Sequence, residues 1–304
     1  MNDTLNGIAP LPHLGVIRAE GEDAAKFLHG QLTQDFALLG LSEARLAAFC
    51  SAKGRMQASF VAFKRSHTEI LLICSRDLLA QSLKRLAMFV LRAKVRLSDA
   101  TDSLALHGLA GPTLQALAGA DAGPWTCQVL GGAHLVHIYP SDGVPRALWV
   151  APAGTALPAG PALSHEDWLW SEVRSGVATV SQPIFEAFVP QMLNYESVGG
   201  VNFKKGCYPG QEVVARSQFR GTLKRRGYLV HGDAKMQAGQ EIYAAGDPKQ
   251  PCGLVAQAAP APAGGWDAIV SLQTASAQDV LHLGQADGPT LTLLPLPYAL
   301  LEDI

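Results

Sequence analysis

The run 205–212, KGCYPGQE, holds the residue types in this chain that are best suited to covalent chemistry. A cysteine reacts as its thiolate, and nearby cations or the positive end of a helix dipole favour that form. Cys207 follows two lysines, and Pro209 is suited to the first position of a helix that continues through Val214. We therefore predict that Cys207 is the reactive centre, with Lys205 beside it. The alternative is a packed, unreactive cysteine, because free cysteines are among the most buried residues.

The chain has five cysteines, Cys50, Cys74, Cys127, Cys207 and Cys252. Their odd number and the lack of any C-x-x-C spacing argue against a disulfide framework, a zinc finger and a resident iron–sulfur cluster. His29, His107 and His137 are scattered without metal-ligand spacing, so we expect no metal site.

The bulk composition is that of an ordinary globular protein of about two domains. The chain has 304 residues, a formal net charge of -2 and 16% charged residues. Direct binding of nucleic acid or an anionic membrane requires clustered excess lysine and arginine, so we expect neither partner. Residues 1–14 lack the features of a secretory signal, and we expect a cytoplasmic protein. The cations 224–226, followed by Tyr228, leave an RNA-binding module as a second alternative.

Hydrophobic periodicity predicts mixed helix and sheet over the first two-thirds of the chain. We expect helices over 21–34 and after Ser75, and strands over 45–50, 56–64, 69–74, 104–107, 134–139 and 147–151. Ser164 to Asp167 forms a capping box that begins a helix ending near Gly176. Short strands over 227–231, 241–244, 253–257 and 291–294 then predict a small C-terminal barrel.

Three segments resemble the YgfZ family of folate-binding proteins, whose fold is similar to that of the glycine-cleavage aminomethyltransferase. They are 27–35 (FLHGQLTQD), 52–55 (AKGR) and 204–216 (KKGCYPGQEVVAR). The last segment is highly specific. The order and spacing of the three segments extend the resemblance over most of the chain. The resemblance implies an α+β fold in which residues 1–221 form mixed sheets and helices around a central folate pocket. Residues 222–304 then form the β-barrel.

The same resemblance implies a role in assembling or maintaining iron–sulfur proteins, some of which modify tRNA. Tetrahydrofolate or a related reduced folate is the expected cofactor, and iron–sulfur client or assembly proteins are the expected partners. The family's cysteine corresponds to Cys207 and its preceding lysine to Lys205.

The family's folate-contacting residues can be assigned to positions of this sequence less directly. The folate-stacking tryptophan corresponds to Trp168, and we also expect contacts from Asn194, Gln211, Glu212 and Arg216. Replacing Trp168 by alanine should weaken binding and leave the fold intact. The alternative is that Trp168 is a core residue, since Trp170 is in the same amphipathic helix. A second aromatic position of the pocket falls on Leu14, so that contact is lost.

One departure from the aminomethyltransferase bears on catalysis. That enzyme has a pair of aspartates at the start of the strand after its glycine turn, whereas the stretch 56–60, MQASF, has no carboxylate. Positioned acid–base groups contribute roughly 10²- to 10⁴-fold to a rate, so we do not expect aminomethyl transfer. A folate-dependent one-carbon transferase or a thiol-dependent oxidoreductase remains the first alternative to the accessory role.

Overall fold

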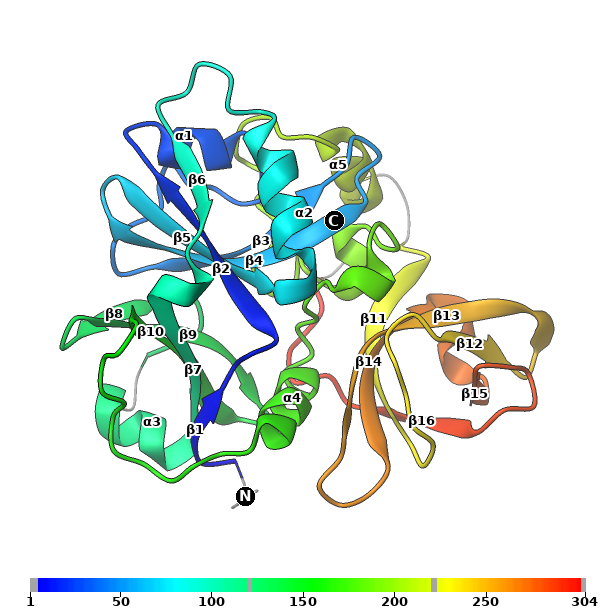
Figure 1. Cartoon of the computed structure of the whole chain (residues 1–304). Coiled ribbons are helices and arrows are strands. Elements are labelled where there is room, and N and C mark those ends of the chain that lie inside the picture. The colour runs from blue at the N-terminus through cyan, green and yellow to red at the C-terminus, as the bar shows by residue number, and fades with distance from the viewer. Residues whose placement is uncertain (1–4, 120–121, 220–222, 302–304) are drawn as a thin grey trace.

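The computed structural model describes residues 5–119, 122–219 and 223–301. Figure 1 shows two β-sheets with covering helices and, beside them, a barrel. The first sheet has the antiparallel order β3-β4-β5-β2-β6. Its strands are β2 (Leu14–Glu20), β3 (Ala44–Cys50), β4 (Met56–Ser66), β5 (Glu69–Ser75) and β6 (Arg96–Asp99). The strands predicted over 45–50, 56–64 and 69–74 are confirmed as β3, β4 and β5, which are neighbours in this sheet.

The second sheet has the antiparallel order β1-β7-β10-β9-β8. Its strands are β1 (Gly7–Pro10), β7 (Leu104–Ala110), β8 (Cys127–Leu130), β9 (Ala133–Ser141) and β10 (Val144–Pro152). The predictions at 104–107, 134–139 and 147–151 are confirmed. The strands β1 and β8, of four residues each, were not predicted.

The two sheets face each other across a shared core, and helices cover their outer faces. Alternation along β5 puts Leu71 and Ile73 into the core between the sheets and Ile70 and Leu72 under the helices of the first sheet. The outer helices are α1 (Ala24–His29), α2 (Arg76–Ala87) and α3 (Gly111–Ala118), the last packed on the second sheet, and a short 3-10 turn, η1, spans Thr101–Ser103. The order of layers is helix, sheet, core, sheet, helix.

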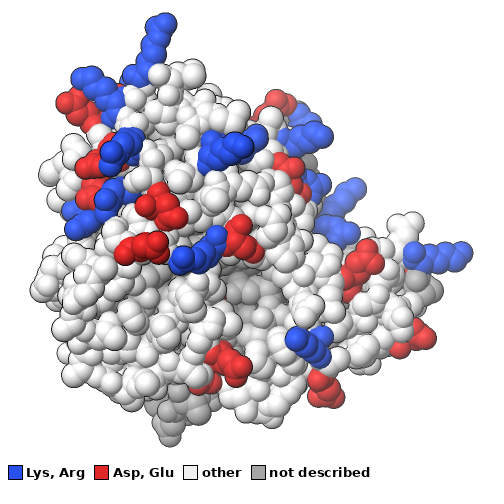
Figure 2. All heavy atoms as spheres, viewed as in Figure 1, with Lys and Arg blue, Asp and Glu red and all other residues white. Residues whose placement is uncertain are grey.

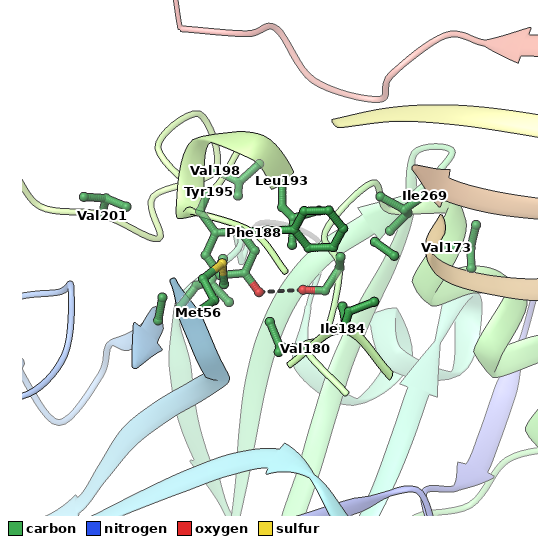
Figure 3. Close-up of a cluster of buried hydrophobic side chains, with 14 of the residues drawn as sticks. Met56, Val173, Val180, Ile184, Phe188, Leu193, Tyr195, Val198, Val201 and Ile269 are labelled. Atoms are coloured by element: carbon green, nitrogen blue, oxygen red, sulfur yellow. Dashed lines mark hydrogen bonds between the residues drawn. The ribbon is translucent and has the colours of Figure 1, made fainter. Parts of the chain in front are cut away.

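Helix α4 (His165–Arg174) joins the second sheet to the barrel. Its start confirms the capping prediction, because the Ser164 hydroxyl accepts a hydrogen bond from the backbone N–H of Asp167 at 3.0 Å. The chain then passes through two 3-10 turns, η2 (Gln182–Ile184) and η3 (Pro190–Leu193). Figure 3 shows the core that this segment shares with Met56 of β4, Val173 of α4 and Ile269 of the barrel.

The barrel is closed, with the order β11-β14-β13-β12-β15-β16. Its strands are β11 (Arg225–Gly232), β12 (Glu241–Ala244), β13 (Asp247–Pro260), β14 (Trp266–Gln273), β15 (Leu281–Leu283) and β16 (Thr290–Leu294), and η4 (Thr274–Gln278) follows β14. The predicted C-terminal barrel is thus confirmed. The domain boundary that we placed between residues 221 and 222 lies outside the described residues.

Two predicted helices differ from the structure. The helix expected over 21–34 is only α1, because beyond His29 the chain turns and Thr33 bonds to Ala48 of β3 instead. The helix expected to begin at Pro209 is α5 (Gln211–Phe219), which begins two residues later. Gly210 has φ of +80°, so the turn before α5 is left-handed and the right-handed helix cannot extend through it.

Gly210 brings the loop that carries Cys207 against the turn between β3 and β4. A Cβ atom on Gly210 would lie 2.4 Å from the carbonyl oxygen of Ser51 and 2.7 Å from the backbone nitrogen of Gly54. Gly54 also has a positive φ, of +70°. The two sequence segments that were singled out separately, KGCYPGQE and AKGR, are therefore in backbone contact, and only glycine permits the approach.

We predict that Gly210→Ala destabilises the protein more than the same change at a glycine with similar φ in open space. Gly143 has φ of +81°, and a Cβ atom there would meet no other atom within 4 Å, so Gly143→Ala is the matched control. The control should lose about 1–2 kcal/mol from the left-handed conformation alone. Gly210→Ala should lose about 1–3 kcal/mol more from the clash with Ser51 and Gly54. Urea unfolding of both variants measures the difference, and equal losses would show that the contact is not tight.

Candidate functional site

A cavity lies between the two sheets, at the centre of the fold. Its atom-free space, which includes the open mouth, is about 560 Å³. Its interior is narrow, since the centre of a water molecule can move through only about 60 Å³ of it. The walls come from both sheets, α4 and the segment after it, and are mainly apolar, with aromatic side chains from Trp125, Tyr139 and Tyr195. We call this space the central cavity.

Glu172 of α4 is the carboxylate that lines the central cavity among the described residues. Its Oε1 accepts hydrogen bonds from Trp168 Nε1 at 2.8 Å and from His13 Nε2 at 3.0 Å. Its Oε2 accepts one from Gln257 Nε2 of β13 at 2.9 Å. Burial alone raises a carboxyl pKa, but here His13, Arg146 and Trp168 together outweigh that effect and lower the pKa of Glu172. The group is therefore ionised at neutral pH.

Arg146 of β10 is the buried cation of the same cavity. Its guanidinium donates to the backbone oxygen of Tyr139 and to the Ser171 hydroxyl, and it lies 5.2 Å from the centre of the Trp168 ring. Burial lowers the pKa of Arg146 to about 10, with the charge of Glu172 opposing that shift. Arg146 stays charged at neutral pH, so the cavity offers one fixed anion and one fixed cation.

Two residues of the cavity, Ser59 and Leu14, lie where the sequence departs from the pattern of similar proteins. Ser59 lines the cavity and its hydroxyl accepts a hydrogen bond from the backbone N–H of Val180 at 2.9 Å. Ala58, the next residue back along β4, is packed on the helix-covered side of the sheet. A hydroxyl therefore stands on the strand where the aminomethyltransferase pattern would have carboxylates. Leu14 also lines the cavity, at the position expected for a pocket aromatic.

Trp168 is fully buried and lies behind the cavity wall. A Cβ atom on Gly108 would come within 2.5 Å of its ring, so the indole fills the space that this glycine leaves in β7. Truncating such a side chain to alanine leaves a large cavity and costs about 3–5 kcal/mol. The burial of Trp168 argues against our expectation that Trp168→Ala leaves the fold intact, and that expectation stays a prediction. Stacking of Trp168 on a folate stays a prediction, and its observed contacts are with Glu172 and Arg146.

Asn194 is also fully buried, and it holds the barrel to the rest of the chain. Its side-chain amide donates to the carbonyl of Gly227 at 2.9 Å and accepts from the N–H of Gly227 at 3.0 Å. The residue has a left-handed backbone, with φ of 57°, which asparagine tolerates. It does not line the central cavity. A folate contact from Asn194 stays a prediction.

Lys205 anchors the loop that precedes α5. Its ammonium donates to the backbone oxygens of His29 and Leu32, the second at 2.7 Å, and lies 4.6 Å from the centre of the Tyr208 ring. Burial lowers the pKa of Lys205 to about 8, while Asp35 and Cys207 oppose that shift. Lysine at this position therefore ties the loop to the end of α1.

Cys207 is exposed, whereas the other four cysteines are buried. Burial raises the pKa of Cys50, Cys74 and Cys127 to about 12 in each case. Cys207 lies four residues before the start of α5, not immediately outside the helix as predicted. It does not line the central cavity.

The remaining predicted folate contacts lie on α5. Glu212 and Arg216 are exposed and form an i,i+4 ion pair at 2.6 Å, and Gln211 is half-buried at the helix start. None of these three lines the central cavity. The structure thus groups Lys205, Cys207 and the α5 residues near one another and keeps them apart from the cavity wall. Their contacts with a folate stay predictions.

Five residues of the cavity were not predicted from the sequence: Glu172, Arg146, Trp125, Tyr139 and Tyr195. One signal was available for Glu172, because it follows Trp168 by four residues and so lies on the same, buried face of α4. No comparable signal marks the others. Across the described residues, no helix is long and apolar enough to cross a membrane, and no group of three His, Cys, Asp or Glu side chains is placed to hold a metal ion.

We predict that Cys207 reacts with iodoacetamide before the other four cysteines in the native protein. It alone is exposed, and burial both blocks the reagent and disfavours the thiolate at the other sites. Site-by-site mass spectrometry over a time course near neutral pH measures the order. Urea-unfolded protein is the control, in which the preference should disappear. Protection of Cys207 until the chain unfolds would contradict the exposed position of this thiol.

The chain is similar to curated proteins over almost its whole length. It is 32% identical over 305 residues to the tRNA-modifying protein YgfZ of Photorhabdus laumondii subsp. laumondii, a match that covers 95% of this chain and 91% of that protein. It is also 32% identical over 300 residues to the protein of the same name from Klebsiella pneumoniae (strain 342), covering 92% and 89%. No protein-family model matches the chain.

The fold is similar to that of a solved enzyme. The glycine cleavage system aminomethyltransferase T from Bartonella henselae superposes with a TM-score of 0.65 over 97% of this chain and 87% of that one, at 14% sequence identity. The expected aminomethyltransferase-like α+β fold with a C-terminal barrel is confirmed. With its sequence identity to curated relatives at 32% over nearly the full length, the chain belongs to the YgfZ family.

Proposed function

We propose that this protein binds tetrahydrofolate or a related reduced folate in the central cavity. The observation that carries the proposal is the ionised carboxylate of Glu172, held in an otherwise mainly apolar and aromatic cavity. The pyrimidine edge of a reduced pterin presents N–H donors, and Oε2 of Glu172, which among the described residues accepts only from Gln257, can accept one of them. The flat ring suits aromatic walls such as those of Trp125, Tyr139 and Tyr195.

The biological role that we propose is that of an accessory protein in the assembly or maintenance of iron–sulfur proteins, and through them in tRNA modification. The curated relatives, which are called tRNA-modifying proteins, support the second part of this role. Cys207 is the group that we propose acts on an iron–sulfur client or assembly protein, because an exposed thiol can reach a macromolecular partner. Its position away from the cavity separates that contact from folate binding.

The two alternatives are less well supported. A one-carbon transferase would need an acid–base group at the reacting end of the cavity, and β4 offers only the Ser59 hydroxyl there. An RNA-binding module would use the cations 224–226, but Arg226 is buried and paired with Glu196, and Arg225 donates to the backbone of Cys252. On the face that Figure 2 draws, positive and negative side chains are interspersed. Such mixing gives no continuous track for a phosphate backbone.

We predict that tetrahydrofolate quenches tryptophan fluorescence in a saturable way and that Glu172→Gln weakens the binding. Trp125 lines the cavity and Trp168 lies behind its wall, so both report on it. A hydrogen bond to a charged group contributes about 1.5–3 kcal/mol, which corresponds to a Kd about 10- to 100-fold higher in the variant. Glu166→Gln, an exposed change on the same helix, is the matched control and should bind like the wild type.

Two outcomes would contradict the proposal. The wild type could give no saturable change up to about millimolar tetrahydrofolate, a binding free energy of about -4 kcal/mol. Alternatively, Glu172→Gln could bind as tightly as Glu166→Gln, which would place the ligand somewhere other than against this carboxylate.

A further inference from the structure

Glu172 separates the central cavity from a second, more open cavity. The second cavity has about 580 Å³ of atom-free space including its mouth, and Glu172 and Thr179 line both spaces. Its other walls come from His13, Ser75 and the barrel strand β13. The surface in Figure 2 is hollowed at its centre, where the first sheet, α4 and the barrel meet in Figure 1. Glu172 therefore faces both spaces, and His13 lies beside it in the second cavity.

Two histidines connect Glu172 to that side in an unbroken hydrogen-bonded chain. His13 Nε2 lies 3.0 Å from Glu172 Oε1, and His13 Nδ1 lies 2.8 Å from His165 Nε2. An ionised carboxylate can only accept, so His13 Nε2 must carry a hydrogen. The contact between the two rings then requires one further hydrogen, which either His13 or His165 supplies. Both ring nitrogens of His13 therefore take part in hydrogen bonds, and the His13–His165 pair can hold a positive charge next to Glu172.

We propose that His13, backed by His165, holds the proton that keeps Glu172 ionised and thereby gives the central cavity its preference for ligand edges made of N–H donors. This inference rests on the proposed folate site and names the residue that sets its selectivity. His13 is a positioning residue, because it acts on the ligand through Glu172. A protonated Glu172 would instead present a hydroxyl donor to the ligand. The N–H donors of the ligand edge would then face another donor and could not form that hydrogen bond.

The charges around the two histidines favour a proton on His13 over a proton on His165. Burial lowers the pKa of His13, but the Glu172 carboxylate outweighs burial and the net direction is upward. Burial likewise lowers the pKa of His165, the neighbouring His13 lowers it further, and Glu172 and Glu166 only partly oppose this. His13 is therefore the member of the pair that keeps the proton.

Other charged groups near the two histidines do not replace the effect of His13 on the pKa of Glu172. Arg146 faces Glu172 from β10 and also holds its pKa down, but its effect is smaller than that of His13. At the start of α2, the backbone N–H of Arg76 bonds to the carbonyl of His13, the Arg76 side chain faces Asp102, and Asp77 bonds to Ser75. Without the His13 cation, burial would push the pKa of Glu172 upward against Arg146 and Trp168 alone.

The variant His13→Gln separates charge from packing. Glutamine keeps an N–H donor for Glu172 but cannot carry the proton. The affinity of the wild type for tetrahydrofolate should change little between about pH 8.5 and about pH 6, because Glu172 stays ionised throughout. The variant should approach wild-type affinity at the alkaline end and weaken by about tenfold or more toward the acid end, as Glu172 takes up a proton that competes with the ligand. His67→Gln, an exposed histidine in the turn after β4, is the matched control.

A loss of affinity in His13→Gln that is equal at every pH would show a packing role and overturn the inference. An affinity unchanged at every pH would do the same. Histidine ring ¹⁵N NMR of the unliganded protein supplies an arm that needs no folate: His13 should keep its proton to higher pH in the wild type than in Glu172→Gln. Failure of the wild type to bind tetrahydrofolate contradicts the proposed function, and identical His13 titrations in the two proteins contradict the present inference.

Discussion

The burial of the Glu172 carboxylate places demands on three separate parts of the chain. Removing an ionised carboxyl group from water is costly unless donors replace the lost hydration. The donors come from His13 before β2, from Trp168 on the same helix and from Gln257 in the barrel. Breaking a buried charge pair by removing one partner typically costs about 3–5 kcal/mol. The N-terminal segment, α4 and the barrel are therefore held in one arrangement around a single side chain.

The barrel takes part in this arrangement through a local irregularity. The register of β13 against β14 shifts between Val255 and Gln257, which is the mark of a β-bulge. Bulges re-aim side chains, and here Gln257 donates to Glu172 and accepts from the backbone N–H of Thr179. Asn194 makes a second connection, to Gly227 of β11. The barrel therefore contributes to the central cavity itself, because Gln257 completes the polar environment of Glu172.

Local patterns in the sequence predicted much of the fold. Alternation identified β3, β4 and β5, and the Ser164 capping box located the start of α4. Errors arose where a distant contact decides the local conformation. Residues 30–34 continue the helical periodicity, yet Thr33 bonds to β3 and Lys205 bonds to the carbonyls of His29 and Leu32. The start of α5 was misplaced because the φ of Gly210 follows from its packing on the β3–β4 turn.

The candidate site was predictable only in part, and for the same reason. The motif around Cys207 is contiguous in sequence, so its exposed thiol and anchoring lysine could be singled out directly. The central cavity has no contiguous signature. Its walls are short pieces of both sheets, of α4 and of the segment after α4, which lie far apart in the sequence. Glu172 becomes recognisable only once His13 and Gln257 are seen beside it. Trp168 was found in the sequence, but its contact with the Glu172 carboxylate was not.

A crystal structure of the protein with tetrahydrofolate bound tests the central claim most directly. We predict that the pterin ring occupies the central cavity between the two sheets, with an N–H donor of its pyrimidine edge about 2.7–3.2 Å from Glu172 Oε2. The His13 ring should remain bonded to the same carboxylate. Folate bound against α5 beside Cys207, with the central cavity holding only water, would contradict the account.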